Sequence, residues 1–305
     1  MDAHRQKITL RATSNTLAEV DDAAIAAELT RLEWQLFKAI RPRDLLRHIL
    51  VAREARGTAG PVAQSIAHFN YVSFWVCSMI LVQSKVKHRA RMVEKFMNIA
   101  AILRHDNNYN SLQAILAGLG NSAVHRLRHT REQLNGKPVN KTYQSLARLM
   151  GSDRSFAAYR LALENSDGRT IPYLGVHLQD LLSMSDGNPS KRAVDNMVHW
   201  RKFSLMDEAV GVIVHCQQWE GSPLVTNASM ERLVKDLPVM DEDHLYQRSL
   251  VVEPRSAQSS SSLPSKLLSK FNATSGSSST SGSGSGGNNS SGGGGGGSNS
   301  IVTHT

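Results

Sequence analysis

Apolar residues spaced three and four positions apart recur along most of the first 255 residues, and this spacing limits the fold more than any other feature. In the first such stretch, Ile25, Leu29 and Leu32 fall on one face of a helix, with Asp21 or Asp22 placed to cap its start. No segment alternates apolar and polar residues for long enough to indicate a half-buried strand. The sequence therefore predicts an all-α fold. The predicted helices cover about residues 22–40, 62–83, 88–103, 112–119, 145–150, 156–163 and 173–184, followed by a long helix that includes residues 206–214.

The composition of the chain changes sharply near Arg255. From Ser256 onward the residues are mostly Ser, Gly and Asn, and residues 292–297 are all glycine. Such a stretch has too few apolar groups to offset the entropy of ordering it, so we expect a disordered Ser/Gly-rich tail over residues 256–305. What precedes it is long enough for one substantial core. We therefore expect an N-terminal extension of residues 1–19 and a single folded domain of residues 20–255.

Several classes of protein are excluded by what the sequence lacks. The two cysteines, Cys77 and Cys216, form neither a disulfide framework nor a zinc motif. The apolar run of residues 69–82 is too short to cross a bilayer, and the charged N-terminus does not look like a secretory signal. His125 and His129 have the spacing of two metal ligands but no third ligand follows, and no phosphate-binding glycine loop is present. We therefore expect a cytoplasmic protein with no metal and no cofactor.

The formal charge of +9 allows two interpretations. Basic residues gather in residues 41–56, 85–95 and 126–131, and a basic face can meet nucleic acid or an anionic membrane surface. A solvated helical surface explains the same pattern. No basic run carries the interleaved aromatic residues of a single-strand binding groove, so we expect no nucleic-acid partner.

Residues 172–219 are the most informative piece of predicted architecture. The sequence Asp-Gly-Asn-Pro at 186–189 is strong turn chemistry, and helices on both sides of it would form an antiparallel hairpin. The first arm is short and apolar on nearly every side, so such a hairpin can project from a domain and present one arm to a partner. Periodicity alone favours two ordinary packed helices.

Five segments are similar, in order and spacing, to the motifs of one known family. They include NNYNSL at 107–112 and IPYLGVHLQDL at 171–181, the second followed by the turn at 186–189. The five segments lie within residues 28–42, 69–76, 107–127, 171–189 and 245–255. On these motifs the chain resembles the catalytic domain of guanine-nucleotide exchange factors for Ras-family small GTPases.

The resemblance implies a mechanism and a set of site residues. In relatives the first hairpin arm wedges into the GTPase, a leucine on that arm intrudes where magnesium sat, and an acidic side chain competes for the hydroxyl that held the metal. These catalytic positions correspond to Leu182 and Asp186. The implied partner is a Ras-family small GTPase in its nucleotide-free or GDP form, and exchange on it makes or breaks no covalent bond. The implied GTPase-binding positions are Tyr173, Phe156, Asn188, Ser183, Gln113 and Gly120.

Other residues of the motifs are expected to be structural. By the resemblance, Asn107, Asn108 and Asn110 hold helix ends by hydrogen bonding, and Arg126 and Glu253 stabilise the fold. We also expect transient association with the inner membrane surface, where lipidated GTPases sit.

The sequence departs from the family pattern in ways that keep three hypotheses open. Asp186 is one methylene shorter than the glutamate common at its position. Many relatives also carry an N-terminal helical module that braces the hairpin, and the roughly 20 residues before this domain are too few for one. The first hypothesis is an active exchange factor, the second a catalytically weak GTPase-binding scaffold, and the third an unrelated helical module that binds polyanions through its basic face. The sequence favours the first.

Overall fold

The structure is a computed structural model that describes residues 3–51, 60–192, 194–221, 225, 227–235 and 237–255, with side chains from residue 8 onward. These residues belong to the first of the two units into which the chain divides, residues 1–255. The tail expected to be disordered, residues 256–305, lies outside the described residues. The fold below is that of the first unit.

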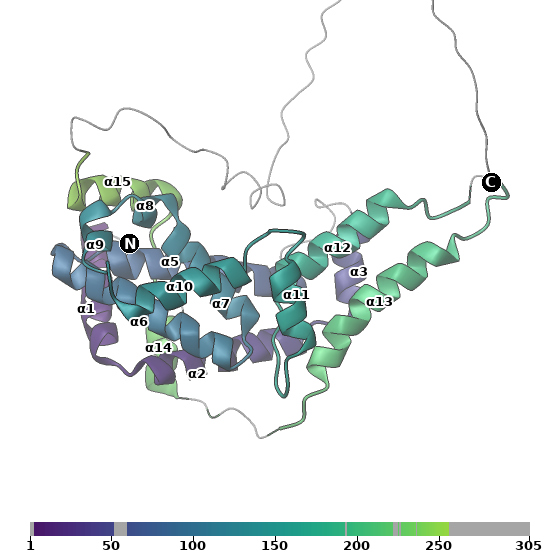
Figure 1. Cartoon of the computed structure of the whole chain (residues 1–305), viewed down its shortest axis with the longest axis horizontal. Helices are drawn as coiled ribbons and strands as arrows, with labels where there is room; N and C mark the ends of the chain where they lie inside the picture. Colours follow the sequence, from purple (N-terminus) through teal and green to yellow (C-terminus); the bar gives the residue numbers. More distant parts are fainter. Residues whose placement is uncertain are drawn as a thin grey trace, which may run out of the picture. The chain divides into compact units, whose positions relative to one another are not determined.

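Helices joined by loops make up the described part of the chain, which contains no β-strand (Figure 1). This confirms the predicted all-α fold. The helices are α1 (Ala3–Glu19), α2 (Asp22–Lys38), α3 (Pro42–Leu50), α5 (Pro61–Leu81), α6 (Val86–His105), α7 (Tyr109–Gly120), α8 (Ser122–His125), α9 (Arg128–Glu132), α10 (Pro138–Leu149), α11 (Ala157–Glu164), α12 (Leu174–Gly187), α13 (Trp200–Gln217), α14 (Ala228–Val234) and α15 (Glu242–Val252).

Local sequence signals explain where several helices begin. Asp21 caps α2 by accepting a hydrogen bond from the backbone N–H of Ala24 at 3.1 Å. Helices α3, α5 and α10 each start with a proline, which needs no N–H partner in the first helical turn. Asn108 caps α7 by accepting from the backbone N–H of Ser111 at 3.0 Å.

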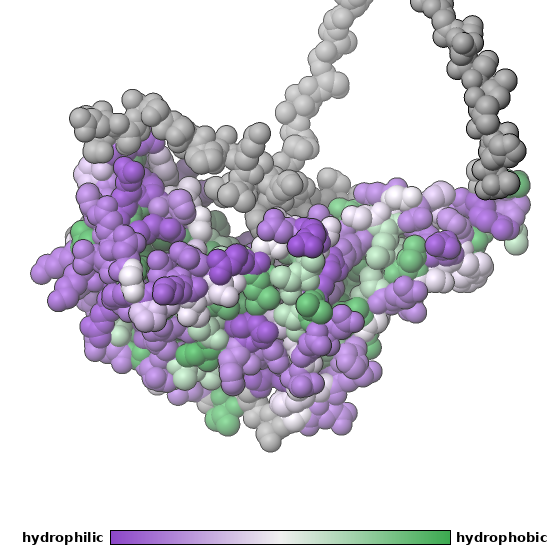
Figure 2. Space-filling model, viewed as in Figure 1, coloured by the Kyte–Doolittle hydropathy of each residue, from purple (hydrophilic) through white to green (hydrophobic). Residues whose placement is uncertain are grey.

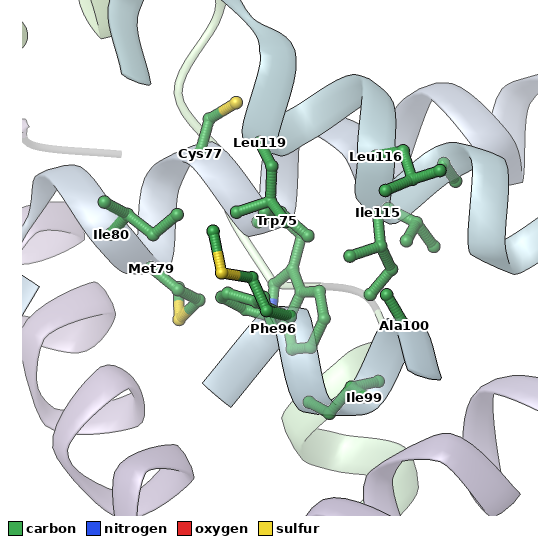
Figure 3. Packing of buried hydrophobic residues seen from close by; sticks show 14 of the residues in the cluster. Trp75, Cys77, Met79, Ile80, Phe96, Ile99, Ala100, Ile115, Leu116 and Leu119 are labelled. Carbon is green, nitrogen blue, oxygen red and sulfur yellow. The ribbon is translucent and has the colours of Figure 1, made fainter. Parts of the chain in front are cut away.

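The larger of two hydrophobic clusters is built around α5, α6 and α7 (Figure 3). Trp75 of α5 is fully buried and meets Phe96 of α6 edge-on, with their ring centroids 5.2 Å apart. Helices α5 and α7 approach so closely that a Cβ at Gly118 would lie 2.7 Å from the Cβ of Val76. It would also lie 2.8 Å from the carbonyl oxygen of Ser73. The absence of a side chain at Gly118 therefore sets the spacing of the two helices at the centre of the core.

Replacing Gly118 with alanine is expected to destabilise the protein by about 1–3 kcal/mol, because the added methyl group overpacks a tight interface. The clash outweighs the gain of roughly 1 kcal/mol that alanine brings to a helix interior. Urea unfolding measures the change. Gly120→Ala on the same helix is the matched control, since a Cβ there meets nothing within 4 Å, and it is expected to be neutral or stabilising. Equal midpoints for the two variants would contradict the packing argument.

An N-terminal extension was expected over residues 1–19, and from residue 3 onward this segment forms α1, which packs against the core. Leu10 and Leu17 are fully buried in the larger cluster. The hydroxyl of Ser14 donates to the carbonyl oxygen of Met79 at 2.8 Å, which ties α1 to α5. The signal was present in the sequence as Leu10 and Leu17, two turns apart, but the stretch around them is polar.

Candidate functional site

Helices α12 and α13 pack side by side as an antiparallel hairpin whose outer end extends away from the other helices (Figure 1). The turn predicted at 186–189 ends α12, and Asn188 donates its side-chain N–H to the carbonyl oxygen of Met184 at 3.0 Å. It does not lead directly into the second arm, because α13 begins only at Trp200. The connection of residues 188–199 has its own backbone bonds, from Arg192 to Met197 and from His199 to Ser190.

A second hydrophobic cluster anchors the base of the hairpin to the rest of the unit. It joins the buried faces of both arms to the end of α2, to α3 and to the start of α5. The side-chain N–H of Gln217 donates to the carbonyl oxygens of Phe37 and Ile40, at 2.7 and 2.9 Å. The hairpin is therefore rooted within this chain. The buried members of the cluster are Phe37, Ile40, Leu45, Val62, Ile171, Leu174, Leu178, Leu181, Met206, Val210 and Ile213.

The start of α12 is held by side chains from α7 and α11. The side-chain oxygen of Asn110 accepts from the backbone N–H of Leu174 at 3.2 Å. The hydroxyl of Tyr159 accepts from the backbone N–H of Tyr173 at 2.8 Å. These two bonds satisfy N–H groups that a helix N-terminus otherwise leaves without a partner. Asn108 and Asn110 thus bond to helix ends, as expected.

His177 is buried beside Tyr159, and the two side chains are hydrogen-bonded at 3.0 Å. Because the backbone N–H of Tyr173 donates to the Tyr159 hydroxyl, the hydroxyl hydrogen is available for Nε2 of a neutral His177. Burial lowers the pKa of His177 from 6.5 to about 4; the charge of Asp180 raises it and that of Arg160 lowers it. The unfolded chain therefore binds a proton on this ring below about pH 6.5, whereas the folded protein does so only near pH 4.

Stability is expected to fall as the pH falls from 6.5 to 4, because the unfolded state takes up protons that the folded state does not. In His177→Gln, the slope of the unfolding free energy against pH should be shallower in this window by up to about 1.4 kcal/mol per pH unit. This is the contribution of the one proton that the unfolded chain no longer takes up at position 177. Urea unfolding at several pH values measures both slopes. The test is the slope and not the unfolding free energy at any single pH, since the variant also loses the hydrogen bond to Tyr159 and is destabilised at every pH. Parallel curves for the two proteins would show that His177 is not held neutral.

The residues predicted to act in exchange lie on the outer half of α12. Leu182, Ser183 and Asp186 are exposed, with 37% of Leu182 accessible. Leu182 and Asp186 are four residues apart, so an apolar side chain and a carboxylate share one face of the helix. Asn188 is half-buried and caps the helix.

Tyr173 and Phe156, predicted to bind the GTPase, come together at the base of the hairpin. Their ring centroids are 6.4 Å apart, and Tyr173 also stacks on Phe69 at 5.7 Å. Gly175 leaves room for this packing, since a Cβ there would lie 2.7 Å from the Tyr173 ring. Tyr173 is only 7% exposed, and burial raises its pKa to about 12. Most of the surface of Tyr173 is thus packed against other residues at the base of the hairpin.

The remaining two predicted contacts lie on α7. Gly120 is exposed at the end of the helix. Gln113 is buried, and its side-chain oxygen has no hydrogen-bond partner among the described residues. The structure thus places the predicted residues in three groups: the outer half of α12, the aromatic residues at its base, and α7.

Sequence reasoning missed an apolar surface at the outer end of the hairpin. Large hydrophobic side chains are exposed there, including Val194 at 98% and Trp200 at 73%. Figure 2 shows hydrophobic and hydrophilic groups intermixed along the hairpin. They lie among basic and polar residues, so no periodic pattern singled them out. The exposed residues of this surface, called the hairpin tip below, are Val194, Met197, Val198, Trp200 and Phe203.

Other kinds of site find little support in the described part of the chain. Among its residues, no group of three His, Cys, Asp or Glu is arranged to hold a metal ion. None of the described helices is long and apolar enough to cross a membrane. Cys77 is buried and burial raises its pKa far above the ordinary value, while burial raises the pKa of Cys216 to about 11. Neither thiol is activated as a nucleophile.

The fold and the site define an all-α domain that carries a projecting helical hairpin. The profile of the RasGEF domain family matches residues 24–204. Ras guanine nucleotide exchange factor A of Dictyostelium discoideum is 37% identical over 262 residues, which cover 81% of this chain and 43% of that protein. The chain belongs to the RasGEF domain family.

Two further relatives show the range of the similarity. Ras guanine nucleotide exchange factor K of Dictyostelium discoideum is 34% identical over 248 residues, covering 81% of this chain and 16% of the relative. Rap guanine nucleotide exchange factor 3 of Rattus norvegicus is 32% identical over 213 residues, covering 70% and 23%. The chain spans less than half the length of these three relatives.

Proposed function

We propose that this protein is a guanine-nucleotide exchange factor that promotes release of GDP from a Ras-family small GTPase. The observation that carries the proposal is the outer half of α12, where exposed Leu182 and Asp186 share one face of a helix whose base is rooted in the domain. Family membership and the names of the relatives, which are Ras and Rap exchange factors, support the same function.

The proposed mechanism is displacement without covalent chemistry. In a P-loop GTPase, a magnesium ion and backbone donors hold the phosphates of the nucleotide. Leu182 enters the space of the metal ion, where an apolar group offers no ligand. Asp186 places a negative charge beside the phosphates and accepts from the hydroxyl that held the metal. Both weaken nucleotide binding, and by reciprocity nucleotide weakens the grip of the exchange factor.

A single helix face is too small to be the whole interface, because stable protein interfaces bury about 800 Å² on each partner. We infer that Asn188 and Ser183 extend the contact along α12, and that Tyr173 and Phe156 contact the GTPase with the ring edges that packing leaves accessible. Gly120 and Gln113 complete the set on α7. The named relatives act on Ras and on Rap, so both GTPase types are candidates for the partner.

The proposal is tested by following release of a fluorescent GDP analogue from a panel of Ras-type and Rap-type GTPases, with and without the full chain. Faster release from at least one GTPase supports it and identifies the partner. A ten-thousandfold acceleration corresponds to lowering the barrier by about 5.5 kcal/mol. No acceleration on any panel member, from protein shown to be folded, would overturn it.

A GTPase-binding scaffold of the same fold is the second candidate, and the hairpin tip is the observation that favours it. Trp200 and Met197 remain exposed although the base of the hairpin is well packed. We infer that the chain braces the base itself, whereas the outer end gains support from a separate helical module such as relatives carry. The scaffold interpretation predicts a complex with the nucleotide-free GTPase, but no faster GDP release.

We also infer a transient association with the inner membrane surface. Arg41, Arg43 and Arg47 are exposed at α3, which packs against the hairpin. Cationic side chains near an anionic bilayer contribute about 1 kcal/mol each. Sedimentation with phosphatidylserine vesicles at low and high salt tests this, with phosphatidylcholine vesicles as the control. Equal recovery with both lipids would exclude an electrostatic association.

A further inference from the structure

Helix α11 meets α12 through three contacts that follow one another along a single face of α12. They involve the backbone N–H of Tyr173, the ring of His177 and the carboxylate of Asp180. These positions are four and three residues apart, which is the spacing of one helix face. Two side chains on α11, Tyr159 and Arg160, make all three contacts.

The third contact is the one nearest the free half of the hairpin. Both terminal nitrogens of Arg160 donate to the Asp180 carboxylate, each at 2.8 Å, so the pair fixes direction as well as distance. The Nε–H of Arg160 donates to the carbonyl oxygen of Ser155 at 2.8 Å. Ser155 and its neighbour Phe156 have left-handed backbones, with φ of 55° and 63°. Arg160 thereby connects this turn of the domain to the outermost of the three α12 contacts with α11. Beyond Asp180, α12 is held by α13, where Lys202 donates to the carbonyl oxygen of Ser185 at 2.8 Å.

The contact between Arg160 and Asp180 contributes little to the stability of the fold. Its effect on the direction of α12 can therefore be tested without unfolding the domain. Arg160 and Asp180 are 38% and 27% exposed at their side chains, and pairs of this kind contribute between 0 and about 1 kcal/mol. By contrast, Asp186 lies six residues beyond Asp180, roughly 9 Å along a rigid helix. A tilt of about 10° at Asp180 would therefore move Asp186 by roughly 1.5 Å.

We propose that Arg160, acting through its bidentate contact with Asp180, is a positioning residue that sets the angle at which α12 enters the GTPase. This inference rests on the proposed exchange function, and Arg160 itself touches neither the nucleotide nor the metal. A misplacement of 1 Å can cost as much as a hundredfold in rate. Loss of the contact thus lowers the rate of exchange while leaving the domain folded.

The test uses the full chain and measures GDP release at increasing concentrations of the exchange factor. Arg160→Ala and Asp180→Ala are each expected to lower the maximal rate about tenfold. The concentration of exchange factor that gives the half-maximal rate should change by less than about threefold. That concentration reports binding of the GTPase, whereas the maximal rate reports the positioning of α12 in the complex. The double alanine variant should be no slower than either single variant, since the two residues act as one unit. Exchanging the charges, with Arg160→Asp and Asp180→Arg together, should recover part of the rate, because it restores the ion pair but not the bond to Ser155.

Arg91→Ala is the matched control, since Arg91 pairs with Glu19 at 3.3 Å on an exposed surface of α6 and α1. It should leave both the rate and the unfolding midpoint unchanged. The inference would be overturned if Arg160→Ala and Asp180→Ala kept the maximal rate of the original protein. It would also be overturned if exchanging the two charges recovered none of the lost rate. If the unaltered protein accelerates no GTPase, the proposed function fails separately. Amide hydrogen exchange then decides the inference: Arg160→Ala should deprotect residues 181–187 more than residues 174–178, and equal protection in both proteins would overturn it.

Discussion

Leu182→Ala is expected to lower the maximal rate of GDP release between ten- and a hundredfold, which corresponds to about 1.4–2.7 kcal/mol of barrier. Leu182 is exposed, so the truncation leaves no cavity in the domain and the unfolding midpoint should stay within the range of surface substitutions. Its loss removes the apolar group that we propose enters the magnesium site. The measurement is release of the fluorescent GDP analogue at saturating exchange factor.

Asp186→Ala should cost a similar factor, and Asp186→Glu tests the geometry of the carboxylate. The carboxylate of Asp186 is exposed near the end of α12, so neither substitution disturbs packing. If the position works best with the longer side chain found in relatives, Asp186→Glu will equal or exceed the rate of the original protein. Asp186→Asn should resemble the alanine variant, since it removes the charge but keeps the size.

Two control variants separate these effects from a general loss of surface groups. Leu161→Ala removes a leucine that is 63% exposed on α11, and Asp207→Ala removes an exposed carboxylate on α13. Both should exchange nucleotide at the original rate. Equal rates for Leu182→Ala, Leu161→Ala and the original protein would contradict the wedge mechanism. Retained binding of the nucleotide-free GTPase together with no exchange by any variant would favour the scaffold.

The secondary structure was largely predictable because helical periodicity is a local property of the sequence. The stripe of Ile25, Leu29 and Leu32 became the buried face of α2, as predicted. Helix α1 was not predicted, since its burial depends on packing against α5 rather than on its own composition. The hairpin connection also differed, because the turn residues at 186–189 specify where α12 ends but not where the next helix starts.

The candidate site was predictable only in part. The resemblance pointed to Leu182 and Asp186, and both are exposed on one helix face. No sequence pattern could pair Arg160 with Asp180, since the contact depends on the angle between two helices. The burial of Gln113 and of most of Tyr173 was equally hidden. Residue type and motif position say which groups are present, whereas exposure is decided by the packing of distant segments.

A buried ion pair helps to hold the C-terminal edge of the domain. Arg89 of α6 is fully buried, and its guanidinium donates to Glu253 at 2.9 Å. The same carboxylate accepts from the backbone N–H groups of His129 and Thr130, both at 3.1 Å, and from the Thr130 hydroxyl at 2.6 Å. Burial raises the pKa of Glu253, but the hydrogen bonds from Thr130 and Arg89 outweigh it and hold the pKa below its usual value.

Glu253→Ala is expected to destabilise the protein by about 3 kcal/mol, because it leaves the charge of Arg89 buried without a counter-ion. The guanidinium keeps its hydrogen bonds to the carbonyl oxygens of Gln83 and Ser84, at 3.1 and 2.8 Å, which offset part of the loss. A loss of this size is a large fraction of the roughly 5–15 kcal/mol that typically separates folded from unfolded domains. Urea unfolding measures the loss. Glu253→Gln should cost less, about 1–3 kcal/mol, since its amide oxygen still accepts hydrogen bonds although the charge is gone. The pH dependence has a defined sign: a depressed pKa gives stability that is complete above the unfolded value of 4.5 and is lost as the pH falls through the folded one.

Gln247→Ala, an exposed position on the neighbouring α15, is the control and should change stability by less than about 0.5 kcal/mol. If Glu253→Ala were no more destabilising than this control, the other hydrogen bonds of Arg89 would be sufficient, and the ion pair would not hold the C-terminal edge. The prediction also bears on function. Glu253 is not part of the cluster that anchors the hairpin, so Glu253→Gln, where it remains folded, should keep its exchange rate while losing stability. Leu182→Ala should do the reverse, and the contrast separates the residues that hold the domain together from those that we propose act on the GTPase.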